Sequence, residues 1–197
     1  MSAAPDVYGR GPYTVEDLDA LPEEGKRFEL VHGWLIPMSP SVRHDESAEV
    51  LKEILADAVR AAGADLSVRG PWDVLMPDRN IYVPDVAVIS RPALREGFRA
   101  DARAVSAADV LLAVEIIRPG SGSEKTVRQV KRIDYAAAGI PSYWIVDLQP
   151  RPSVSVLQAE RSGGYREVSW VVAGDCLQAD QPVTIAFDPA SLLPEIG

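Results

Sequence analysis

Apolar residues recur along the chain with two periods, one typical of helices and one typical of strands. The helical period is clearest over residues 43–62, where the shared apolar face is formed by Ala48, Leu51, Leu55, Ala58 and Ala62. Gly63 is a good stop for this helix, and Gly139 closes a second helix predicted over 124–138. Thr14 opens a capping-box-like pattern, which predicts that a short helix begins there.

Runs of apolar and β-branched residues predict buried strands at residues 80–90, 110–117 and 143–147. The helix predicted over 124–138 separates the last two strands, so a parallel pairing between them would form a right-handed crossover. Alternating segments follow in the tail and predict antiparallel strands at 154–157, 167–172 and 183–187.

Weaker signals complete the predicted sheet. A hairpin is predicted over 27–38, short strands at 66–69 and 72–76, and a polar loop with a helical fragment over 91–107. The pattern as a whole predicts an α/β, or α+β, fold. We expect a central mixed β-sheet flanked by helices, with an added antiparallel C-terminal edge.

Length and composition indicate one globular unit. The 197 residues, 47% of them apolar, predict a single domain over 13–197, preceded by a flexible Pro- and Gly-rich segment at 1–12. No run approaches the roughly 18 apolar residues of a membrane span, and no signal peptide is evident at the N-terminus. The single cysteine, Cys176, excludes an internal disulfide and predicts a cytoplasmic protein.

The charge pattern is uneven. A net charge of −9 excludes a basic nucleic-acid coat protein, but a metal ion and a local basic stripe could still serve a nuclease. Such a stripe follows residue 115 and consists of Arg118, Lys125, Arg128, Lys131 and Arg132.

Two acidic residues interrupt the apolar strands. Because strand side chains alternate, Glu115 shares a face with Ala113 and Ile117, and Asp85 lies in a similar run. A buried carboxylate must be paired, protonated or bound to metal, so each acid could pair with a basic side chain or end a strand facing water. Two such acids on neighbouring strands would repel each other unless a cation lay between them.

The chemistry of these two side chains favours a hard cation. Oxygen ligands suit Mg²⁺ or Mn²⁺, whereas two histidines in all and no nearby cysteine argue against zinc. Pro84 removes one ladder hydrogen bond and predicts an edge, a bulge or a strand start, which would expose Asp85 to a cleft.

The order Pro84–Asp85, then Glu115 in a buried strand, resembles the PD-(D/E)XK nuclease superfamily, which has a restriction-endonuclease-like fold. A longer series of segments resembles the Uma-type restriction endonucleases, a bacterial family long catalogued as a domain of unknown function. In chain order these segments are 13–41, His44, 82–89, 111–121 and 131–147.

The resemblance implies roles for particular residues. Asp85 and Glu115 would be the metal-binding acids, and Glu29 a further ligand or a residue that holds a metal-bound water. The superfamily often has a lysine two residues after the glutamate, where this chain has Ile117. The Uma-type family instead implies Lys131, on the following helix, as the catalytic lysine.

One departure concerns the helix. Many family members carry an aspartate four residues before the lysine, whereas this chain has Val127 and therefore lacks that acid. Lys131 could instead make a surface pair with Asp134, and Glu29 could be an exposed hairpin acid. His44 is either structural or, if it faces the cleft, could contact a substrate phosphate or shuttle a proton. Arg128 is a candidate for the same phosphate contact.

We therefore expect a metal-dependent endonuclease that uses Mg²⁺ or Mn²⁺ to hydrolyse phosphodiester bonds of nucleic acid, with DNA as the expected substrate. One alternative is a nuclease-like fold that no longer cuts and acts as a binding or assembly module, for example as a homodimer. Another is a metal hydrolase that acts on small phosphoesters.

Overall fold

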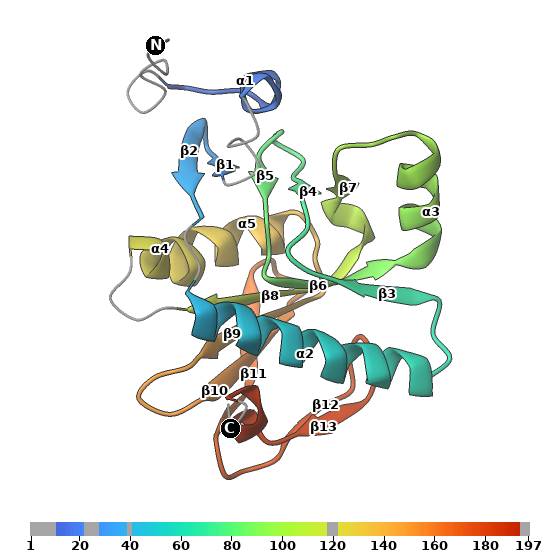
Figure 1. Ribbon diagram of the computed structural model, residues 1–197, viewed down its shortest axis with the longest axis vertical. Coiled ribbons are helices and arrows are strands. Elements are labelled where there is room, and N and C mark those ends of the chain that lie inside the picture. The colour runs from blue at the N-terminus through green and yellow to red at the C-terminus, as the bar shows by residue number, and fades with distance from the viewer. Residues whose placement is uncertain (1–10, 22–27, 39–40, 118–121, 194–197) are drawn as a thin grey trace.

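The computed structural model describes residues 11–21, 28–38, 41–117 and 122–193 (Figure 1). Its largest sheet has six strands in the order β11-β10-β9-β8-β6-β3. Strands β8 and β9 are parallel and all other pairs are antiparallel, so the sheet is mixed, as predicted. The bounds are β3 Leu66–Arg69, β6 Val86–Ser90, β8 Val110–Ile117, β9 Ser142–Asp147, β10 Ser153–Ala159 and β11 Tyr165–Val172.

A second sheet has five short strands in the order β2-β1-β5-β4-β7. Its strands are β1 Phe28–Val31, β2 Trp34–Pro37, β4 Val74–Leu75, β5 Ile81–Tyr82 and β7 Val105–Ser106. The hairpin predicted over 27–38 is confirmed as β1 and β2. The C-terminal edge formed by β10 and β11 is also confirmed, but the predicted strand at 183–187 pairs elsewhere, as β13 (Ile185–Phe187) with β12 (Leu177–Ala179).

The prediction of a single strand over 80–90 is wrong. The segment forms two strands, β5 and β6, which belong to different sheets. Pro84 has no N–H to donate to a ladder, and the N–H of Val83 is taken by the side chain of Glu29. Both features end the pairing of β5 and leave residues 83–85 to cross from one sheet to the other.

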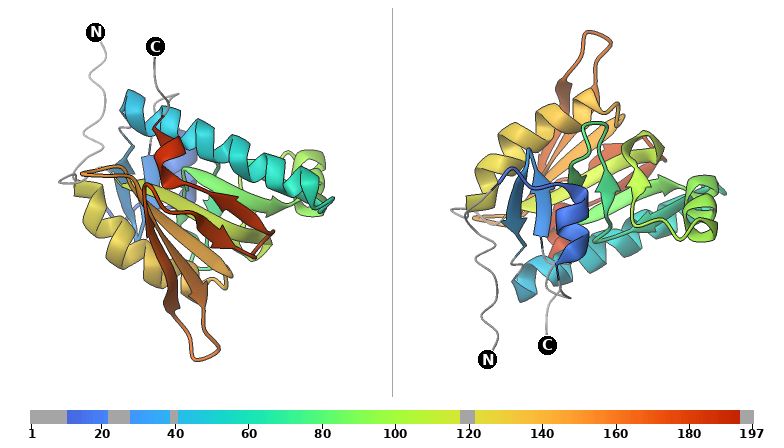
Figure 2. Two further views of the ribbon diagram at one scale, coloured as in Figure 1. Left: turned by 90° about the horizontal axis from the view of Figure 1, so that it is seen from below. Right: turned by 90° about the horizontal axis from the view of Figure 1, so that it is seen from above.

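Helices cover both faces of the six-stranded sheet (Figure 2). Helix α2 (Val42–Ala61) packs its buried residues Leu51, Leu55 and Val59 on one face, together with the β12–β13 hairpin. The predicted second helix lies on the opposite face. It consists of α4 (Gly122–Lys125), a π-helical segment at Thr126–Lys131, and α5 (Arg132–Ala137).

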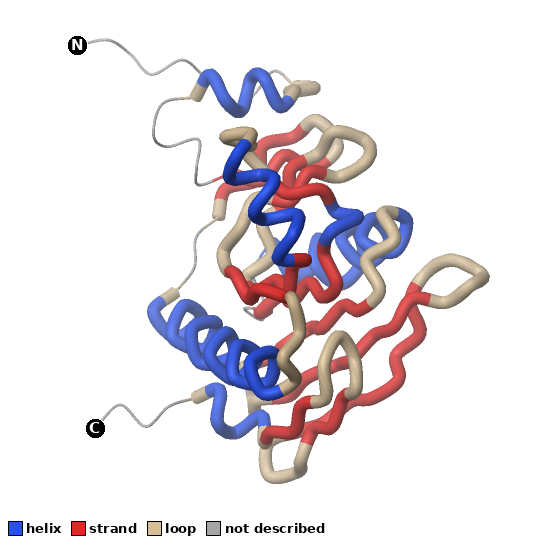
Figure 3. The backbone as a smooth tube through the Cα atoms, turned by 90° about the vertical axis from the view of Figure 1, so that its right-hand side faces the viewer, coloured by secondary structure: helices blue, strands red, loops and turns tan. Residues whose placement is uncertain are grey.

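The remaining helices lie around the five-stranded sheet and the ends of the larger one (Figure 3). Helix α1 (Val15–Ala20) carries the predicted capping box of Thr14 and Asp17, and α3 (Arg91–Arg99) is the helical part of the predicted polar loop. In the part of the chain that the structure describes, two short 3₁₀ turns lie at Ala107–Asp109 and Pro189–Leu192. None of the helices in the described ranges has the length and apolar character needed to span a membrane. The flexible segment predicted at 1–12 falls mostly on residues 1–10, outside the described residues.

Candidate active site

Asp85 and Glu115 lie opposite each other at the point where the chain passes between the two sheets. The register of β6 and β8 pairs Val86 with Val114, so the next step places Asp85 beside Glu115. The Oδ2 atom of Asp85 accepts a hydrogen bond of 2.6 Å from the backbone N–H of Ile116. This bond fixes one oxygen of Asp85 to the strand that carries Glu115.

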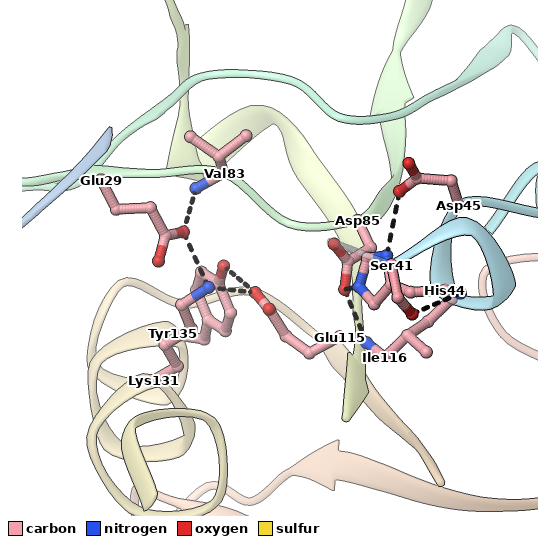
Figure 4. Close-up of polar contacts among 10 residues, drawn as sticks. All are labelled: Glu29, Ser41, His44, Asp45, Val83, Asp85, Glu115, Ile116, Lys131 and Tyr135. Carbon is pink, nitrogen blue, oxygen red and sulfur yellow. Dashed lines mark hydrogen bonds and ion pairs between the residues drawn. The ribbon is translucent and has the colours of Figure 1, made fainter. Parts of the chain in front are cut away.

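A buried lysine joins Glu115 to an acid from the other sheet (Figure 4). The Nζ atom of Lys131 lies 2.7 Å from Oε1 of Glu115 and 2.7 Å from Oε1 of Glu29. All three side chains are buried, with 3% of Lys131, 4% of Glu115 and 6% of Glu29 exposed. The alternative readings of Lys131 as a surface partner of Asp134, and of Glu29 as an exposed acid, are therefore wrong.

Burial and charge act in opposite directions on these groups. Burial lowers the pKa of Lys131, but the charges of Glu115 and Glu29 outweigh burial and raise it, so the ammonium stays charged. Burial raises the pKa of Glu115, and Lys131 opposes this while Asp85 and Glu29 reinforce it. The centre therefore holds more acidic groups than its lysine can neutralise.

Glu29 also supports the crossing between the sheets. Its Oε1 atom accepts a hydrogen bond of 2.6 Å from the N–H of Val83, two residues before Asp85. One carboxylate oxygen thus links the ammonium of Lys131 to the segment that carries Asp85. In this arrangement Glu29 holds other members of the site in place.

His44 reaches the site from the first turn of α2. Its Nε2 lies 3.2 Å from Oδ2 of Asp85, and its Nδ1 lies 3.2 Å from Oδ1 of Asp45. Burial lowers the pKa of His44, but hydrogen bonds and charges from Asp85 and Asp45 outweigh burial and raise it to about 9. A protonated imidazole therefore engages both carboxylates and has no ring N–H left over.

Arg128 lies three residues before Lys131, in the π-helical segment Thr126–Lys131. Its Nε is 3.2 Å from Glu124 and its Nη2 is 2.5 Å from Asp147, at the end of β9. The side chain is 39% exposed, and a guanidinium carries three further N–H groups. Arg128 is thus beside the site rather than in its buried centre.

Two positions depart from the expected patterns, Ile117 from that of the superfamily and Val127 from that of the Uma-type family, and both are apolar and buried. Ile117 and Val127 both lie in the core between the sheet and the helix. The backbone carbonyl of Val127 accepts a hydrogen bond from the hydroxyl of Tyr143. The side chain of Val127 therefore packs in the core and supplies no polar group to Lys131.

Sequence reasoning missed two residues that shape the site. A Cβ atom on Gly70 would lie 2.0 Å from the carbonyl oxygen of Asp85. Only glycine therefore allows the backbone just after β3 to come this close to the backbone of Asp85. The hydroxyl of Tyr135 donates a hydrogen bond of 2.9 Å to Oε1 of Glu115. The spacing of Tyr135, four residues after Lys131, is the one signal that indicates a shared helix face.

The donor set fits a divalent cation with few protein ligands. Within the described ranges, no three His, Cys, Asp or Glu side chains are arranged to hold a metal. Mg²⁺, however, is commonly held by one or two carboxylates together with water and substrate phosphate. The described residues donate no hydrogen bond to Oδ1 of Asp85 or Oε2 of Glu115. Each acid therefore keeps one carboxylate oxygen that can bind a cation.

Comparisons with known proteins agree with this architecture. No curated protein shows significant similarity to the chain. A crystal structure described as a putative nuclease belonging to DUF820, from Anabaena variabilis ATCC 29413, is similar in fold, with a TM-score of 0.66 and 16% identity. The similarity covers 92% of this chain and 98% of that chain, which confirms the predicted α/β fold. The Uma2 family model, described as putative restriction endonuclease, matches residues 15–189. Because this match spans most of the length of the chain, the chain belongs to the Uma2 family.

Proposed function

We propose that this protein is a divalent-metal-dependent endonuclease that hydrolyses phosphodiester bonds of nucleic acid, with DNA as its substrate. The observation that carries the proposal is the pair Asp85, immediately before β6, and Glu115, on the adjoining strand β8, with a buried lysine bound to Glu115. Membership of a family described as putative restriction endonucleases supports the same reaction class. The single free cysteine, Cys176, supports a cytoplasmic location.

Asp85 and Glu115 would hold the cation through the oxygens that accept no hydrogen bond from the described residues. A bound Mg²⁺ or Mn²⁺ would supply positive charge beside the scissile phosphate and lower the pKa of water. His44 and the N–H of Ile116 both bind Oδ2 of Asp85, and so they orient its other oxygen. The role proposed for His44 is therefore to position Asp85.

Lys131 supplies a fixed positive charge at the centre. An ammonium has three N–H groups, and the bonds to Glu29 and Glu115 use two of them. In the proposed reaction the third N–H would orient the attacking water or stabilise charge that develops on the phosphate. We assign Glu29 the role of holding Lys131, and Arg128 the role of contacting a neighbouring phosphate through its remaining N–H groups.

The proposal is tested by nicking of supercoiled plasmid with purified protein. We expect relaxed and linear products in Mg²⁺ or Mn²⁺ and none when EDTA is in excess, because the acids alone cannot neutralise the phosphate. Metal binding by calorimetry without nicking of plasmid, single-stranded DNA or RNA would instead favour a non-cutting binding module. Cleavage that is unaffected by EDTA would contradict the metal-dependent mechanism.

A further inference from the structure

Four buried tyrosines form a row that runs from β5 through α5 to β9 and β11 of the six-stranded sheet. Successive ring centroids lie 5.5 Å, 5.2 Å and 5.7 Å apart, in the order Tyr82, Tyr135, Tyr143 and Tyr165. The hydroxyls of Tyr143 and Tyr165 donate to backbone carbonyls, those of Val127 and Ile140. The hydroxyl of Tyr135 donates instead to a carboxylate of the candidate site.

Two donors converge on one oxygen of Glu115. Lys131 and Tyr135 are one helical turn apart, on the same face, and both bind Oε1, at 2.7 Å and 2.9 Å. Oε2 of Glu115 accepts no hydrogen bond from the described residues. The two donors thus determine which oxygen of Glu115 is left for a ligand (Figure 4).

The two donors differ in how firmly they hold that oxygen. The ammonium of Lys131 ends a flexible stem and is shared with Glu29. The hydroxyl of Tyr135 ends a rigid ring, which is packed edge-on between Tyr82 and Tyr143. A tyrosine hydroxyl is protonated at neutral pH, so it can donate to the carboxylate of Glu115.

We propose that Tyr135 is a positioning residue for Glu115: its hydroxyl holds Oε1 and thereby directs Oε2 toward a divalent cation shared with Asp85. The inference rests on the proposed function, because it requires a cation site at these two acids. Hydrogen bonds from such neighbouring groups fix the orientation of metal ligands and typically change metal affinity about 10–100-fold.

The test is Mn²⁺ binding to the full chain by calorimetry, with Tyr135→Phe compared with Tyr165→Phe. Both variants remove one buried hydroxyl from the same row and keep the ring, but only Tyr135→Phe removes a bond to Glu115. We expect Tyr135→Phe to weaken Mn²⁺ binding about 10-fold or more, and Tyr165→Phe to leave it unchanged. Thermal unfolding of both variants measures the shared cost of the lost hydroxyl.

A rescue separates the hydrogen bond from packing. The residue 4-aminophenylalanine at position 135 carries an N–H donor where tyrosine has its hydroxyl, so it should restore Mn²⁺ affinity even if Tyr135→Phe does not fold. Wild-type affinity in Tyr135→Phe, or equal weakening in Tyr165→Phe, would overturn the positioning role alone. Absence of Mn²⁺ binding in the wild-type protein would overturn it together with the proposed metal site.

Discussion

Replacement of Asp85 by asparagine, or of Glu115 by glutamine, is expected to lower the rate of plasmid nicking about 1000-fold or more. Each change keeps the size of the side chain but removes one of the two charges proposed to hold the cation. Loss of several kcal/mol of charge stabilisation at the phosphate corresponds to this factor, since about 1.4 kcal/mol is tenfold in rate.

The matched control is Asp65→Asn. Asp65 is an exposed acid before β3 that pairs with Arg91 and Arg95, so its removal changes the net charge equally without touching the site. We expect it to nick at the wild-type rate. Thermal unfolding should show folded protein for all three variants. Nicking by Asp85→Asn or Glu115→Gln at the control rate would show that the proposed acids do not act in cleavage.

Replacement of Lys131 by methionine is expected to lower the free energy of unfolding by about 3–5 kcal/mol at pH 8. The variant keeps the volume of the side chain but leaves Glu29 and Glu115 buried without their cation. Removal of one partner of a buried ion pair is costly because the other charge stays in a poorly solvating environment. The double variant Lys131→Met with Glu115→Gln should recover part of the loss.

The loss should depend on pH in a defined direction. Burial already raises the pKa of Glu115, and removal of Lys131 takes away the charge that opposes this shift. When the folded-state pKa of a carboxyl exceeds its unfolded value, about 4.3 for glutamate, the free energy of unfolding falls as pH rises through the folded-state pKa. Lys131→Met should therefore be less destabilised at pH 5 than at pH 8, as measured by urea unfolding.

Lys125 supplies the control for this pair of measurements. It is exposed on α4, in the same helical run, so Lys125→Met should change the unfolding free energy by less than about 0.5 kcal/mol at both pH values. A loss in Lys131→Met as small as that of the control, or a loss equal at pH 5 and pH 8, would mean that the buried acids do not depend on Lys131.

Much of the fold follows from sequence periodicity. Helix α2 and strands β8 and β9 are long enough, and apolar enough, for their pattern to predict them directly. The split between β5 and β6 escapes the pattern because the apolar run continues across it. The π-helical segment at Thr126–Lys131 also escapes, since its apolar spacing differs little from that of an α-helix.

The candidate site could be predicted only in part, for a related reason. Asp85 and Glu115 are conspicuous because an acid in an apolar strand must have a partner. The contact of Lys131 with Glu29 joins residues 102 positions apart, and no local pattern encodes it. Tyr135 looks like an ordinary core residue, and Gly70 matters only through its approach to Asp85.

The most direct test is to locate the cation by anomalous diffraction from crystals grown with Mn²⁺. We expect a manganese peak within coordinating distance of one oxygen of Asp85 and one oxygen of Glu115. The same peak should be lost from crystals of Glu115→Gln. A manganese ion bound elsewhere, with Lys131 still on Glu115 and no density between the two acids, would contradict the proposed centre.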